Sequence, residues 1–177
     1  GKNAESEKAL EKMWKGDYWE NFDNSVEGFK TRIEDGEMDA MSGLSSFYHS
    51  AAGNAEAGLH ICEDDEKLLW EERREECLRK AMAASDSFVE TKENQGLKLT
   101  VNQLDVRQSI LRKMNGSRDD EALVAIQEAL EHKHSEMGPH VPGLLKLGEL
   151  QIRLRGTGEI TQGDVETLFQ DIRLSAE

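Results

Sequence analysis

Small residues interrupt an apolar, helix-like segment at 37–51, and this feature constrains the packing of the chain more than any other. Ala40, Gly43, Ser45, Ser46 and Ala51 stand where large side chains usually fill the buried face of a helix. A small side chain lets a neighbouring helix approach closely, whereas a large one would hold the two axes apart. The segment therefore predicts a helix with close neighbours.

Apolar residues recur at steps of three and four along most of the chain, which is the spacing of one face of an α-helix. The chain has only two prolines, Pro139 and Pro142, and is rich in residues that favour helices. The sequence therefore predicts an all-α fold. The expected helices cover residues 4–15, 17–34, 37–51, 65–85, 97–114, 119–133 and 141–155, with a last one from about 161, and the expected loops cover 51–65, 91–96, 135–140 and 156–160.

Several helices carry end signals or a distinct apolar stripe. For 17–34, Asp17 is the expected N-cap and Gly36 the expected C′ residue. The segment 97–114 is the least regular, because residues 97–101 alternate as in a strand. The expected stripes are Tyr18, Trp19, Phe22, Val26, Phe29 and Ile33 in the second helix, Leu69, Trp70, Cys77, Leu78, Ala81, Met82 and Ala84 in the fourth, Leu144, Leu147, Leu150 and Leu154 in the seventh, and Val165, Leu168, Phe169 and Ile172, predicted to be buried, in the last.

The helices recur as pairs joined by loops that contain glycine, with a period of roughly 40 residues. Such a period is typical of an α-solenoid, in which stacked pairs bury the apolar faces that no single pair can bury alone. We therefore expect a single helical domain over 1–177, with an N-terminal helix in 1–16 and three to four helix pairs in 17–177. The alternative is a helical bundle without repeats.

Residues 40–53 resemble the first helix of a tetratricopeptide-type repeat, and more closely its longer variant, the Sel-one-like repeat. Ala40, Leu44, Tyr48 and Gly53 stand where that family places Ala, Leu, Tyr and the loop Gly, and Ser45 stands where it usually has Gly. Three later segments are similar. They supply the Leu147-Gly148 pair of a first helix, and the second-helix spacings of Ala122, Ile126 and Ala129 and of Val165, Phe169 and Ile172.

The resemblance implies a non-catalytic protein–protein interaction module, because partners of that family bind as peptides or helices on the concave face. The implied partner-binding residues are Ser42, Ser46, His49 and Ser50 from the first such helix and Glu149, Ile152 and Arg153 from the last. A related expectation is a peripheral subunit of a larger assembly, in which Trp14, Tyr18 and Trp19 anchor the interface. The alternative for these three residues is the core or a cap on the first repeat.

The chain has 36 acidic and 22 basic residues, a formal net charge of −14. This charge disfavours nucleic acid and anionic lipid, since both are bound through Lys and Arg. It favours solubility and a basic protein or peptide as partner. No apolar run approaches the roughly 20 residues of a membrane helix. The chain begins at Gly1 rather than Met, which is compatible with a removed leader and leaves the compartment open.

Few residues point to catalysis or to a cofactor. His132 and His134 form an HxH pair with His140 nearby, and clustered imidazoles bind zinc, copper or nickel. A metal-binding or enzymatic bundle using these histidines is therefore the alternative function. No nucleotide-binding or hydrolase motif occurs, so we expect no cofactor and no catalytic residue. Cys62 and Cys77 could pair only if the fold brought them together.

Overall fold

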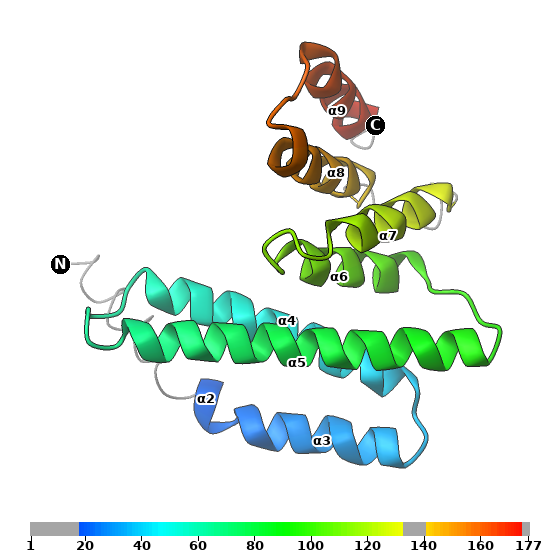
Figure 1. The fold of residues 1–177 in the computed structure, drawn as a ribbon. Helices are drawn as coiled ribbons and strands as arrows, with labels where there is room; N and C mark the ends of the chain where they lie inside the picture. Colours follow the sequence, from blue (N-terminus) through cyan, green and yellow to red (C-terminus); the bar gives the residue numbers. More distant parts are fainter. Residues whose placement is uncertain (1–17, 133–140, 175–177) are drawn as a thin grey trace. The chain divides into compact units, whose positions relative to one another are not determined.

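The structure is a computed structural model that describes residues 18–132 and 141–174. The described chain consists of α-helices and contains no strand, which confirms the all-α prediction. Its contacts divide it into two compact units, 1–91 and 92–177 (Figure 1). The predicted helix over 4–15, the Asp17 cap and the loop over 135–140 lie outside the described residues.

The first unit holds α2 (Tyr18–Glu20), α3 (Phe22–Glu34), α4 (Asp39–Leu59) and α5 (Lys67–Asn94), whose last turn crosses into the second unit. The helix predicted over 17–34 is interrupted at Asn21, so α2 and α3 are separate. The C′ prediction for Gly36 is confirmed. Its φ is +88°, and the amides of Gly36 and Glu37 donate to the carbonyls of Ile33 and Arg32. These two bonds satisfy carbonyls that a helix end would otherwise leave unpaired.

α4 is longer than predicted, and the loop expected over 51–65 is wrong for residues 51–59. Gly53, which the family resemblance placed in a loop, lies inside the helix. Alanine has the highest helix propensity, and Ala51, Ala52 and Ala55 are fully buried. Contacts with another helix therefore extend α4 through a segment whose small and polar composition resembles a loop.

The small residues of α4 make room for both of its neighbours. A Cβ on Gly43 would lie 2.7 Å from Cε1 of Phe29 in α3. On the α5 side, the buried Ser45 hydroxyl donates to the Ala81 carbonyl at 3.0 Å. The expected close approach of helices around α4 is thus present, on two sides at once.

α5 also continues beyond its predicted end. The turn expected over 91–96 is helical as far as Asn94. Gly96, with φ +67°, then ends the helix, and the amides of Gly96 and Leu97 donate to the carbonyls of Glu93 and Lys92. This is the same hydrogen-bond pattern that ends α3.

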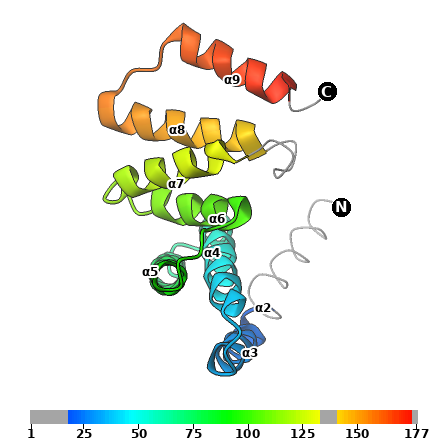
Figure 2. The ribbon, with the colours of Figure 1, turned by 90° about the vertical axis from the view of Figure 1, so that its right-hand side faces the viewer.

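The second unit holds α6 (Val101–Arg112), α7 (Asp119–Glu131), α8 (Val141–Thr157) and α9 (Gln162–Leu174). Each helix packs on the next (Figure 2), and α6 also contacts α8. Ile110, Leu111, Ile126 and Leu145 are large side chains with almost no exposed surface. Helices α6, α7 and α8 therefore share one apolar core.

The first helix of this unit begins later than predicted. Residues 97–100 are not helical, so the predicted start at Leu97 is wrong. Thr100 is the N-cap, its hydroxyl accepts from the Gln103 amide, and the Gln103 side chain accepts from the Thr100 amide. This reciprocal capping box fixes the start of α6 at Val101.

The prediction that α9 is buried is wrong for two of its residues. Phe169 is 66% exposed and Val165 is 39% exposed, while Leu168 is half-buried. None of residues 162–170 is fully buried. α9 therefore packs on α8 with Phe169 largely uncovered, while the side chain of Ile172 lies outside the described residues.

Candidate interaction surfaces

The predicted binding residues of α4 share one side of that helix. Ser42, Ser46 and His49 are half-buried, and Ser50 is exposed. Their spacing of three and four places them together, away from the buried row of Ala40, Leu44 and Ala51. Hydroxyls and an imidazole on one face can offer hydrogen bonds to a partner, and their binding role stays a prediction.

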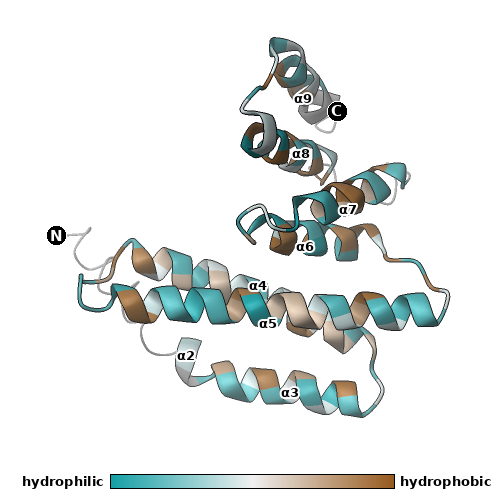
Figure 3. Ribbon diagram, viewed as in Figure 1, coloured by the Kyte–Doolittle hydropathy of each residue, from teal (hydrophilic) through white to brown (hydrophobic). Residues whose placement is uncertain are grey.

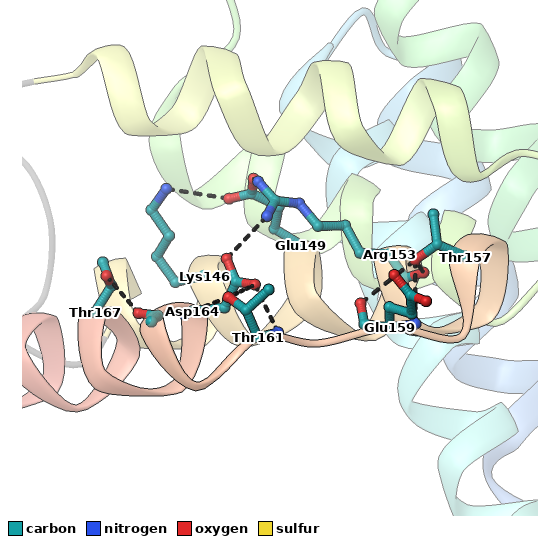
Figure 4. Close-up of polar contacts among 9 residues, drawn as sticks. Lys146, Glu149, Arg153, Thr157, Glu159, Thr161, Asp164 and Thr167 are labelled. Carbon is teal, nitrogen blue, oxygen red and sulfur yellow. Dashed lines mark hydrogen bonds and ion pairs between the residues drawn. The ribbon is translucent and has the colours of Figure 1, made fainter.

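Two of the three predicted residues of α8 line a charged cleft against α9 (Figure 4). Glu149 accepts from Arg153 at 2.6 Å and from Lys146 at 3.1 Å. Arg153 also reaches Asp164 of α9 at 3.1 Å. The cleft has a volume of about 140 Å³ and is lined further by Leu150, Thr167 and Leu168.

The first residues of α9 complete this polar network. Thr161 and Asp164 form a reciprocal cap, in which the Thr161 hydroxyl donates to Asp164 at 2.6 Å and accepts from the Asp164 amide at 3.2 Å. The hydrogen bonds from Thr161, and then the charge of Arg153, hold the pKa of Asp164 below its usual value. The Arg153–Asp164 ion pair therefore links the start of α9 to α8 beside Leu150 and Leu168 at the cleft.

The third predicted residue of α8, Ile152, is buried. The exposed side of the helix instead carries Leu144, Leu147 and Leu154, which are 40% to 51% exposed. Their spacing was visible in the sequence as an apolar stripe, but periodicity does not reveal which stripe faces the core. Sequence reasoning therefore missed these residues as candidates for partner contact.

Tyr18 and Trp19 belong to an aromatic cluster, and Trp14 lies outside the described residues. The centroid of the Trp19 ring lies 5.0 Å from the ring centroid of Phe22 and 6.1 Å from that of Trp70 in α5. The Arg73 guanidinium lies 5.0 Å from both indole rings, a favourable cation–π geometry. Burial raises the pKa of the Tyr18 phenol. These contacts use both side chains within the first unit, while their role as interface anchors stays a prediction.

The thiols and histidines form no metal site in the part of the chain that the structure describes. His132 is the C-cap of α7, and His134 and His140 lie outside the described residues, so the alternative built on these histidines stays a prediction. Cys62 and Cys77 are both free thiols. Burial raises the pKa of Cys77 to about 11, which keeps it protonated near neutral pH.

Among the described helices, none is both long and apolar enough to cross a membrane. Comparison of the chain with protein-family models, curated protein sequences and solved structures finds no match in any of the three.

Proposed function

We propose that this protein is a non-catalytic protein–protein interaction module, acting as an adaptor, a scaffold or a peripheral subunit of a larger assembly. One observation carries the proposal. Leu144, Leu147 and Leu154 form an exposed apolar row on α8, a helix whose other side is already packed in the core. Exposed rows of large apolar side chains are typical of protein contact sites.

The arrangement of helices supports the same proposal. In the second unit each helix packs on the next and α6 also contacts α8, as in stacked helix pairs. We propose that this stacking is a short α-solenoid of the tetratricopeptide type. Solenoids present extended surfaces made by several helices, and these surfaces serve binding more often than catalysis.

The test is quantitative capture of proteins from the native cell extract by the tagged full chain, at low and then at moderate salt. The triple variant L144S/L147S/L154S is compared with wild type, and V124S/L97S serves as the control. Val124 and Leu97 are exposed apolar residues elsewhere in the second unit. A stoichiometric partner that survives moderate salt and is lost only with the triple variant supports the proposal. Retention of nothing beyond salt-sensitive basic proteins contradicts it.

A further inference from the structure

The loop between α4 and α5 and the first turns of α5 carry a second exposed apolar group. We call residues 61–75 the hairpin tip, because they join two antiparallel helices of the first unit. Ile61, Leu68 and Leu69 are exposed there by 48% to 65%. Figure 3 shows hydrophobic turns of both helices beside the hydrophilic loop that connects them.

The hairpin tip also carries carboxylates that no basic side chain of the described residues neutralises. Within the described part of the chain, no ion pair is formed by Glu63, Asp65, Glu71, Glu72 or Glu75, and all five are exposed. Glu63 and Asp65 precede α5, where its dipole favours negative charge. Glu71, Glu72 and Glu75 lie beyond the first turn, so the dipole does not explain them.

The nearby cations that the structure describes are already engaged. Lys67 pairs with Asp64 at 2.6 Å, and Arg74 lies 4.0 Å from Glu56. Arg73 lies over the indole rings of Trp19 and Trp70. Arg79 and Lys80 both pair with Glu76, at 2.7 and 3.1 Å. The apolar group is therefore surrounded by a local excess of negative charge.

Leu68, Glu71, Glu72 and Glu75 share one face of α5, because they are spaced by three, four and seven residues. A ligand that binds this face of α5 contacts Leu68 at the N-terminal end of the face and the three carboxylates farther along the helix. A basic amphipathic helix has the complementary pattern, with Leu-like residues on one side and Lys or Arg beside them.

The hairpin tip is held in place before any partner arrives. Trp70 is fully buried, and its indole fills the space left by the missing side chain of Gly58. The amides of Ile61 and Cys62 both donate to the Gly58 carbonyl, at 3.1 and 2.9 Å. A surface fixed in this way loses little conformational entropy on binding.

We infer that the hairpin tip is the docking surface for a basic amphipathic segment of a partner protein, with Ile61, Leu68 and Leu69 as its apolar contacts. This inference rests on the proposed function as an interaction module. The acidic face supplies long-range attraction and orientation, and the leucines supply most of the free energy of binding.

The experiment titrates the full chain against a fluorescent synthetic peptide of leucine and lysine, arranged as an amphipathic helix whose leucine face is bordered by lysines. A peptide with glutamate in place of lysine, and one with serine in place of leucine, are the ligand controls. L68S/L69S is expected to raise the Kd about tenfold, the size of effect typical of a central contact. E71Q/E72Q/E75Q is expected to weaken binding mainly at low salt, because screening already suppresses long-range attraction at about 0.15 M salt.

D120N/E128Q/E131Q removes three exposed carboxylates from α7 and is the matched control, expected to leave the Kd nearly unchanged. Several results would overturn the inference: no binding by wild type, binding that is insensitive to L68S/L69S, or equal losses in the α5 and α7 charge variants. Self-association of wild type that L68S/L69S abolishes would also overturn it, in favour of a second copy. If the captured partner were lost only with the α8 triple variant, the hairpin tip would not be its docking surface, while the proposed function would still stand.

Discussion

Gly58 of α4 leaves the space that the indole of Trp70 of α5 occupies. A Cβ at position 58 would lie 2.7 to 2.9 Å from three atoms of that ring. An indole cannot yield as the end of a flexible chain can, because its ring moves as one rigid body. The close approach of α4 and α5 at this end therefore depends on the absence of a single side chain.

Gly58→Ala is expected to destabilise the first unit by about 1–3 kcal/mol through overpacking. The measurement is chemical denaturation followed by circular dichroism. Gly53→Ala is the matched control in the same helix, since a Cβ there meets nothing within 4 Å. Removing glycine from a helix interior stabilises by about 0.5–1 kcal/mol. Equal effects of the two substitutions would contradict the described packing.

Gly148→Leu is expected to destabilise the second unit by about 1–3 kcal/mol. A Cβ on Gly148 would lie 3.2 Å from Gln108 Oε1 and from Arg112 Nε of α6, and Leu adds further atoms to that contact. Burial lowers the pKa of the Arg112 guanidinium, which also donates to the Gln151 side chain. Gly156→Leu is the control, since nothing lies within 4 Å of a Cβ there. An unchanged melting temperature for Gly148→Leu would argue that α8 does not pack on α6.

Thr161→Ala is expected to loosen the start of α9, because it removes the hydroxyl that caps the helix and bonds to Asp164. Since the folded pKa of Asp164 is lowered, its stabilisation is present above the usual carboxyl range and is lost as the pH falls through the lowered value. The protection factors of the α9 amides, in which the pH dependence of intrinsic exchange is divided out, should therefore fall on acidification in wild type and depend less on pH in the variant. The same pH dependence in both proteins would contradict this account of Asp164.

Alkylation should separate the two thiols. Near pH 8, Cys77 is expected to react much more slowly than Cys62, because it is buried and its pKa is raised to about 11. Mass spectrometry of peptides after brief treatment with iodoacetamide measures both rates in one sample. Denaturant should bring the two rates together, which serves as the control. Fast labelling of Cys77 in the folded protein would contradict its burial.

Local signals in the sequence predicted some features well. Gly36 ends α3 because only glycine readily adopts the left-handed backbone that the stop requires. The spacing of Ala122, Ile126 and Ala129 predicted a helix that the structure contains, with these residues in its buried face.

Other features depend on contacts that no local pattern contains. Residues 51–59 resemble a loop in composition, and they are helical because Ala51, Ala55 and Gly58 pack closely against their surroundings. Phe169 lies on a regular apolar stripe, but the spacing alone cannot say that its side chain remains largely exposed. At the hairpin tip, a count of acidic and basic residues could not reveal that the neighbouring cations contact other side chains and leave several carboxylates without an ion pair in the described chain.

Two aromatic rings pack directly against glycines of α4: Phe29 against Gly43 and Trp70 against Gly58. On a regular helix, these positions are about 22 Å apart along the axis. α3 cannot slide along α4 unless Phe29 moves away from Gly43, and α5 cannot slide along α4 unless Trp70 moves away from Gly58. The two rings therefore set the axial register of the three helices. A force applied to α3 or α5 would be transmitted to the other through α4 without a change of register.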